Sequence, residues 1–236
     1  MSGHARATVS AKAITITGNA SGTGVATQLS TLNVLAGGTD LLVIGNNSNQ
    51  AGTGISIDGY GTISNVANGG NITFKSNNNI NQTTAITMAA NTSGTAKALT
   101  YDVTSGTNAS TVVGGNLTLT AGSTSPVNYN LLAAGAHLDG GAINVPGTIT
   151  LDNTYGRAAG ATTAPLSGYI TAANISAAVA TEGITINSAM TGGTGVVIKG
   201  VSSGGNAVNT TAGLTATTGN VVILSLIHIS EPTRPY

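Results

Sequence analysis

The chain has 236 residues, enough for one domain with a sizeable core. It contains 34 Gly, 38 Thr, 24 Asn and 20 Ser, about half of the total, whereas only 6% of its residues are charged and 3% are aromatic. This composition argues against a helical bundle, because Thr, Asn and Gly are poor helix formers. The absence of Cys excludes a disulfide framework, a thiolate metal site and a cysteine nucleophile. Seven basic and seven acidic residues give zero net charge and no electrostatic footprint for nucleic acid or an anionic membrane.

The first twelve residues, MSGHARATVSAK, do not have the apolar run of a secretory signal. The protein is therefore either cytosolic or Met1 is an internal codon of a longer gene, and we favour the second reading. No apolar run in the chain approaches the roughly 18 residues of a membrane-spanning helix. The hydrophobic content of 40% and the grouping of Ile, Val and Leu argue against disorder.

Short runs in which apolar and polar residues alternate follow one another along the chain. This period of two predicts β-strands with one side chain inside and the next outside. Ile, Val and Thr fill the runs, and Gly and Asn bracket them as expected for positive-φ turns. The expected strands lie at residues 13–18, 41–45, 54–59, 70–76, 85–89, 98–103, 115–122, 147–153, 168–176, 183–188, 195–200 and 219–223.

The scarcity of large side chains favours a β-solenoid over a sandwich or a barrel. One Phe, no Trp and six Tyr are too few to fill a core about 10 Å thick. A narrow interior of Ile, Val, Leu and Ala suits coils that stack on one another and contact only their neighbours. In such a stack, rows of Thr and buried ladders of Asn would bond from coil to coil.

A phrase of Gly, a polar residue and a strand recurs at Gly70, Gly115, Gly147, Gly183 and Gly219, at intervals of 45, 32, 36 and 36 residues. Two coils of 16–23 residues per interval account for this spacing, which is typical of stacked-coil proteins. We therefore expect ten to twelve coils in a rod of about 50 Å, at about 4.8 Å per coil. The unequal intervals predict inserted loops at residues 103–113, 123–144 and 153–167.

The last thirteen residues, LSLIHISEPTRPY, differ abruptly in composition from the rest. Residues 224–234 match, residue for residue, the translation of the transposase adapter used in short-read DNA library preparation. We therefore expect residues 1–223 to be a β-solenoid passenger fragment and residues 224–236 to be an adapter-derived, non-native tail. On this reading the natural protein continues beyond the sequence given.

Residues 69–106 and 114–123 carry the phrase G-G-N-[IL]-T-[FL]-x-[SA] and resemble the passenger regions of filamentous-haemagglutinin-like and autotransporter adhesins. The resemblance is one of composition and rhythm and covers most of residues 13–223. It implies an all-β, right-handed parallel β-helix that is exported across a Gram-negative outer membrane and displayed at the cell surface. The secretion pore or membrane barrel would lie outside this fragment.

Candidate catalytic groups are few. Asp40 and Asp58 are 18 residues apart, about one predicted coil, and could stack, while Asp139 and Asp152 could share a face. Clustered carboxylates of this kind would serve a polysaccharide lyase or hydrolase of the β-helix fold, although Asp is also a common turn residue. His4 and His137 are isolated. We therefore expect no metal site, no cofactor and no catalytic residues.

An ice-binding solenoid would display Thr-x-Thr triplets in a regular row. The triplets that begin at Thr15, Thr118, Thr148 and Thr215 share no common coil length. This irregular spacing disfavours ice binding.

The leading hypothesis is a structural stalk and adhesive segment of a large secreted or cell-surface bacterial protein, without catalysis. Its partners would be glycans or proteins on a host or neighbouring cell, held by many weak contacts. Tyr129, Tyr155 and Tyr169 lie in or beside the predicted insertions and are the candidate surface-contact residues. The alternatives are the β-helix lyase or hydrolase and a surface-layer-like structural component.

Overall fold

The computed structural model describes residues 7–9, 13–29, 32–34, 40–49, 52–58, 63–65, 68–104, 111–114, 117–119, 122–133, 137–154, 183–202 and 206–227. Every regular element in these ranges is a β-strand. No helix long and apolar enough to cross a membrane is found among them. The predicted strand at residues 168–176 lies outside the described residues.

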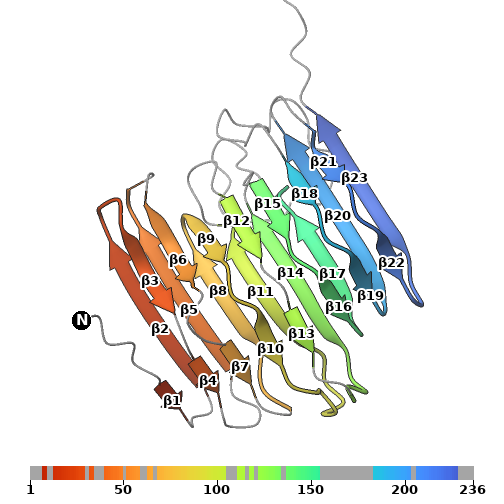
Figure 1. Cartoon of the computed structure of the whole chain (residues 1–236), viewed down its shortest axis with the longest axis horizontal. Coiled ribbons are helices and arrows are strands. Elements are labelled where there is room, and N and C mark those ends of the chain that lie inside the picture. Colours follow the sequence, from red (N-terminus) through yellow and green to blue (C-terminus); the bar gives the residue numbers. More distant parts are fainter. Residues whose placement is uncertain are drawn as a thin grey trace, which may run out of the picture.

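The strands form three parallel sheets, and consecutive strands pass from one sheet to the next (Figure 1). Sheet A contains β1 (Ala7–Val9), β4 (Leu32–Val34), β7 (Ile63–Asn65), β10 (Ile86–Met88), β13 (Leu117–Leu119), β16 (Ile143–Val145), β19 (Met190–Gly192) and β22 (Leu214–Ala216). Sheet B contains β2 (Ala13–Ala20), β5 (Asp40–Asn47), β8 (Ile72–Ser76), β11 (Lys97–Val103), β14 (Val127–Ala133), β17 (Thr148–Asp152), β20 (Gly195–Ser202) and β23 (Val221–Ile227). Sheet C contains β3 (Val25–Leu29), β6 (Thr53–Ile57), β9 (Asn79–Gln82), β12 (Thr111–Gly114), β15 (His137–Gly140), β18 (Ile184–Ile186) and β21 (Val208–Thr210).

Each strand inside a sheet pairs with the third strand before it and the third strand after it, which confirms the predicted parallel β-helix. One coil therefore consists of one strand from each sheet. Sheets of eight, eight and seven strands stack about 4.8 Å per level, so the described levels span about 34 Å. The expected rod of ten to twelve coils and about 50 Å is wrong, because each coil uses more residues than predicted.

The pairing register gives the true coil length. One position of sheet B is occupied in turn by Ile14, Leu41, Ile72, Leu99, Tyr129, Ile149, Val196 and Val221. The interval is 20 residues from Tyr129 to Ile149, 47 from Ile149 to Val196, and 25–31 elsewhere. The long interval contains the segment between β17 and β18, where an insertion was expected at residues 153–167.

The recurrent glycine phrase gave the wrong coil length because it precedes strands of all three sheets. The phrases at Gly70, Gly147 and Gly219 lead into sheet B, whereas Gly115 leads into sheet A and Gly183 into sheet C. The interval between phrases is therefore not a whole number of coils. The insertion expected at residues 123–144 is also wrong, since these residues contain β14 and β15 as regular members of the stack.

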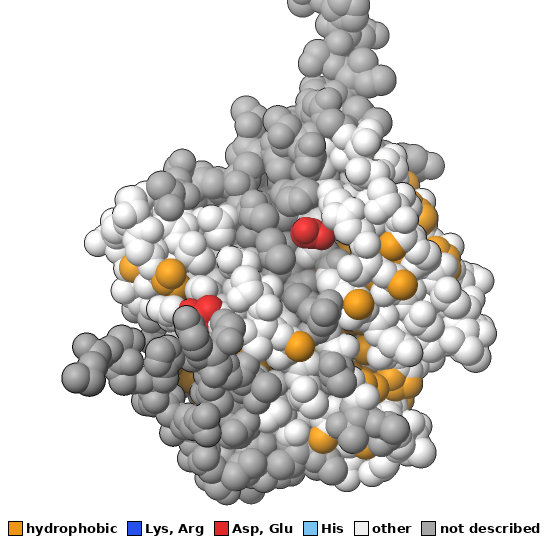
Figure 2. All heavy atoms as spheres, viewed as in Figure 1, with side chains coloured by type: hydrophobic (Ala, Val, Ile, Leu, Met, Phe, Trp, Pro, Cys, Tyr) orange, Lys and Arg blue, Asp and Glu red, His pale blue; other side chains and the backbone are white. Residues whose placement is uncertain are grey.

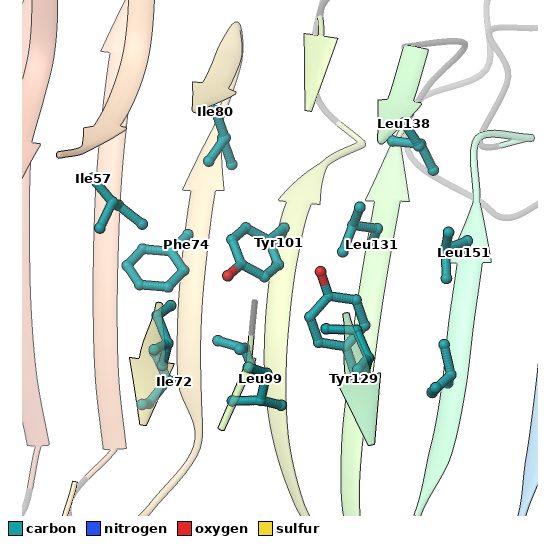
Figure 3. Packing of buried hydrophobic residues seen from close by; sticks show 14 of the residues in the cluster. Ile57, Ile72, Phe74, Ile80, Leu99, Tyr101, Tyr129, Leu131, Leu138 and Leu151 are labelled. Atoms are coloured by element: carbon teal, nitrogen blue, oxygen red, sulfur yellow. The ribbon is translucent and has the colours of Figure 1, made fainter. Parts of the chain in front are cut away.

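The core consists of columns of inward-facing residues. In one column of sheet B, Val43, Phe74, Tyr101, Leu131, Leu151 and Ile198 follow one another. All six side chains are fully buried, at 0% exposure. Figure 3 shows four members of this column in a row, Phe74, Tyr101, Leu131 and Leu151. Ile57, Ile80 and Leu138 of sheet C lie beside them in the same core cluster. The thin, largely aliphatic interior predicted from the composition is confirmed.

Most described glycines serve close packing between chain segments. A positive φ occurs among the described residues only at Asn68 (57°), Gly94 (76°) and Gly122 (98°). At Gly45, by contrast, a Cβ atom would lie 2.1 Å from the carbonyl oxygen of Gly54. The expectation of positive-φ turns therefore holds at a few corners only.

Asn47 connects coils at a corner through backbone groups and not through the predicted buried ladder of asparagine side chains. Asn47 is 3% exposed, and its Nδ2 donates to the carbonyl oxygen of Gly24 in the preceding coil (2.8 Å). Its backbone N–H donates to Oδ1 of Asn77 in the following coil (2.9 Å). The buried amides thus satisfy backbone groups that no sheet can pair, and the direct pair between Asn46 and Asn19 (3.2 Å) is exposed.

Candidate functional site

The structure places Tyr129 in the core. Its side chain is 0% exposed and belongs to the inward column of sheet B, so the prediction that it contacts a partner at the surface is wrong. In β14 the polar residues Asn128 and Asn130 alternate with inward Val127, Tyr129 and Leu131, which is the pattern of a strand. Tyr155 and Tyr169 lie outside the described residues, and their role stays a prediction.

Three aromatic rings form a buried cluster on neighbouring strands. The ring centroids of Phe74 and Tyr101 are 5.3 Å apart, and those of Tyr101 and Tyr129 are 5.9 Å apart. Both tyrosine rings point into the interior (Figure 3). The cluster is a packing element, because it has no exposed surface to offer a ligand.

The two tyrosine hydroxyls have different surroundings. The hydroxyl of Tyr101 donates a hydrogen bond to Oε1 of Gln82, whereas that of Tyr129 has no partner in the described part of the chain. Burial raises the pKa of Tyr101 well above its ordinary value, and the neighbouring Tyr129 adds to this effect. Burial also raises the pKa of Tyr129, with a smaller contribution from the negative charge of Asp139. Both hydroxyls therefore stay protonated while the protein is folded.

The structure does not bring together the carboxylate pairs suggested by sequence spacing. Asp40 begins β5 in sheet B and accepts hydrogen bonds from the backbone N–H (2.7 Å) and Nδ2 (3.2 Å) of Asn71. Asp58 follows β6 of sheet C and accepts a hydrogen bond from Nε2 of Gln28. Asp139 and Asp152 likewise belong to sheets C and B. Each member of the two pairs lies on a different side of the solenoid from its proposed partner.

Two lysine–aspartate pairs, which the sequence analysis missed, join neighbouring strands of sheet B. Lys75 Nζ lies 3.8 Å from an Asp102 carboxylate oxygen, and Lys199 Nζ lies 3.2 Å from Asp152. The register aligns each lysine directly with its aspartate. This alignment requires the true coil length, so the sequence spacing alone could not have found it.

Both aspartates of these pairs belong to the same local motif, Asp-x-Thr. Asp102 Oδ1 accepts hydrogen bonds from the backbone N–H (3.0 Å) and hydroxyl (2.6 Å) of Thr104. Asp152 Oδ1 accepts the same two bonds from Thr154, at 2.9 and 2.6 Å. The motif ends β11 and β17 by satisfying a backbone donor beyond the sheet. With lysine and threonine already bound to them, these carboxylates fit a structural role.

We expect Asp152→Ala to destabilise the protein more than Asp102→Ala. The Asp152 side chain is 4% exposed and that of Asp102 is 21% exposed. Removing Asp152 leaves buried donors of Thr154 unsatisfied, which should cost roughly 2–3 kcal/mol. Because Asp102 is more exposed, Asp102→Ala should lower the free energy of unfolding by only about 1 kcal/mol. Urea denaturation of the two variants measures the difference, and equal losses would contradict the structural role assigned to burial.

An open groove of about 500 Å³ crosses the corner between sheets A and B over four successive coils. Its apolar part is formed by Leu119, Val145 and Pro146. Hydroxyl and amide side chains complete it: Ser123, Asn144, Thr194, Thr217 and Thr218. None of the described residues that line the groove is charged. Its chemistry suits an uncharged, hydroxyl-rich surface, bound through hydrogen bonds and van der Waals contact.

Charged side chains are sparse elsewhere too. On the face in Figure 2, acidic side chains occupy two separated places among polar and scattered apolar atoms. Within the described part of the chain, no three His, Asp or Glu side chains are close enough to hold a metal ion. His137 begins β15, and His4 lies outside the described residues.

The sheets and columns define the chain as a parallel β-solenoid protein. Comparison of the chain with protein-family models, with curated proteins and with solved structures finds no match. The resemblance to haemagglutinin-like and autotransporter passengers therefore stays a prediction from the sequence.

Proposed function

We propose that this solenoid is a structural stalk and adhesive segment of a large secreted or cell-surface bacterial protein. The observation that supports this proposal best is the unbroken stack of parallel coils, whose core columns continue through every described level of sheet B. Such a stack can extend along its axis without a thicker core. A rod of this kind suits the task of holding contact surfaces away from a cell.

The groove between sheets A and B supplies the contact surface in this proposal. Its uncharged hydroxyl and amide lining favours neutral glycans or polar protein surfaces on a host or neighbouring cell. Contacts with so few groups are weak individually, so adhesion would rest on many copies displayed together. The tyrosines proposed from the sequence are not needed for this role.

The test is adhesion of beads coated with the purified chain to bacterial and animal cells. Asn144→Lys places a long charged side chain in the groove and is expected to reduce bead retention. Asn81→Lys is the matched control, since Asn81 is exposed on β9 of sheet C, outside the groove. Equal retention of the two variants would refute the groove as the contact surface, and no retention of any coated bead would refute the adhesive role. Release of sugar fragments from polysaccharides by the chain would instead support the enzyme alternative.

A further inference from the structure

The outer face of sheet A carries uncharged polar side chains on successive levels of the stack. Each of these residues lies between two less exposed residues of its strand, and together they form what we call the sheet A row: Ser64, Thr87, Asn144, Thr191 and Thr215. The parallel register places them directly above one another from β7 to β10 and from β16 to β22. The levels from β7 to β22 span five steps of the stack, about 24 Å at about 4.8 Å each.

The other two sheets do not present such a uniform face. The outward positions of sheet B include Lys75, Asp102 and Leu132, which lie beside one another in the register. One outward position of sheet C is Asp139. Charged and aliphatic side chains therefore interrupt the polar pattern on those faces, and the uniform row is a property of sheet A.

The groove at the corner between sheets A and B runs alongside this row. Asn144 belongs to both, and Thr217 and Thr218 of the groove follow soon after Thr215 of the row. The groove crosses four successive coils, so its length is parallel to the solenoid axis, like that of the row. The row and the groove together form one polar strip with a recess along its side.

The chemistry of this strip fits an uncharged polymer with hydrogen-bonding groups on every unit. None of the described residues of the row or the groove is Lys or Arg, which anionic polymers require. The large apolar side chains exposed among the described residues lie in β3 and β23, so sheet A lacks the apolar centre of a protein interface. A neutral polysaccharide has hydroxyls on every sugar, and in an extended chain the length of one sugar is comparable to the spacing between coils.

We propose that the sheet A row and the groove bind an unbranched, uncharged polysaccharide that lies parallel to the solenoid axis. Leu119, Val145 and Pro146 of the groove contact C–H groups of the sugar rings, and the row bonds hydroxyls of successive sugars. Each contact is weak, so the affinity depends on the number of levels that one chain covers. This inference rests on the proposed contact role of the groove and adds a ligand class, an orientation and the sheet A row.

Titration calorimetry of the full chain with cello-, laminari-, manno- and xylo-oligosaccharides tests the proposal, with alginate oligosaccharides as the anionic comparison. We expect at least one neutral series to bind with an affinity that rises with the number of sugars, and alginate not to bind. Absence of binding to every neutral series, equal affinity for short and long members, or binding of alginate alone would each overturn the proposal.

Thr191→Lys and Thr185→Lys form a matched pair of variants. Both threonines are the partly exposed middle residues of three-residue strands, Thr191 in sheet A and Thr185 in sheet C. Thr191→Lys should weaken binding of the best-bound oligosaccharide roughly tenfold or more, because it leaves an unpaired charge in the contact. Thr185→Lys should bind like the unchanged chain. Equal affinities of the two variants would refute the assignment to sheet A.

Thr87→Lys separates this inference from the proposed function. Thr87 belongs to the row but is not among the residues that line the groove, so its replacement should weaken only the longer oligosaccharides. No effect of Thr87→Lys on them, together with weakening by Asn144→Lys, would refute the axial row and leave the groove as the contact surface. Oligosaccharide binding by a chain whose coated beads do not adhere to cells would instead refute the adhesive role and support the present inference.

Discussion

Phe74→Ala is expected to lower the free energy of unfolding by about 3–5 kcal/mol, because it removes a fully buried ring from the centre of the stack. The ring lies between Val43 and Tyr101 in the core column and contacts the Tyr101 ring at a centroid distance of 5.3 Å. Since each coil contacts only its neighbours, no distant part of the core can close over the cavity. Urea denaturation followed by circular dichroism measures the loss.

Thr73→Ala is the matched control for this prediction. Thr73 precedes Phe74 in β8 and points to the outer face, so its replacement should change stability by no more than about 0.5 kcal/mol. A cost for Phe74→Ala as small as that of the control would mean that sheet B does not face the interior as described.

Alkaline pH is expected to unfold the protein because two tyrosines are buried. The hydroxyls of Tyr101 and Tyr129 have pKa values raised by burial, whereas a tyrosine in the unfolded chain loses its proton near pH 10. The stability that these groups contribute is present below about pH 10 and is lost as the pH rises toward their folded-state pKa values. Two groups give a loss of about 2.7 kcal/mol per pH unit above that point. Denaturation at a series of pH values measures this slope.

Phenylalanine variants separate the contributions of the two tyrosines. Each single replacement should halve the alkaline slope assigned to the pair, and the double replacement should remove it. At neutral pH the variants should differ in sign. Tyr129→Phe removes a buried hydroxyl that has no partner among the described residues and should be stabilising by about 1 kcal/mol. Tyr101→Phe removes the hydrogen bond that Gln82 Oε1 accepts from Tyr101 and should be destabilising by about as much. An unchanged alkaline slope in the double variant would show that other groups cause the unfolding.

The sequence was sufficient to predict strands, their parallel stacking and the aliphatic interior. Alternation of apolar and polar residues located β8, β11 and β17 to within about two residues. The scarcity of Phe and Trp led to the solenoid because a thin core requires no large side chains. These features depend on local pattern and composition, which a single sequence contains.

The length of the coil could not be predicted because it depends on which strands share a sheet. Glycines that precede strands look alike in all three sheets, so Gly70 and Gly115 seemed equivalent although they lead into sheets B and A. The error carried over to the candidate site. Asp40 and Asp58 were matched by a coil of the wrong length, while Lys199 and Asp152, which do pair, are separated by the 47-residue interval between β17 and β20.

Tyr129 was misplaced because the unequal intervals between the glycine phrases predicted an inserted loop at residues 123–144, which contains it. Asparagine is uncommon in strands, and Asn128 and Asn130 flank Tyr129 in this segment. In the structure both asparagines point outward, and Asn128 Oδ1 accepts a hydrogen bond from the backbone N–H of Thr148 in the next coil (2.9 Å). In a solenoid, asparagine is therefore compatible with the outer face of a strand.

Equivalent positions of consecutive coils in sheet B face the core in the same register, so one coil can be removed and its neighbours still pair. Ile72 and Leu99 hold the same place in consecutive coils, so excision of residues 72–98 would set Leu99 against Leu41 and Tyr101 against Val43. Both new neighbours are apolar and face inward. Unequal recombination between such coils would change the reach of the molecule in steps of about 4.8 Å, without altering its cross-section.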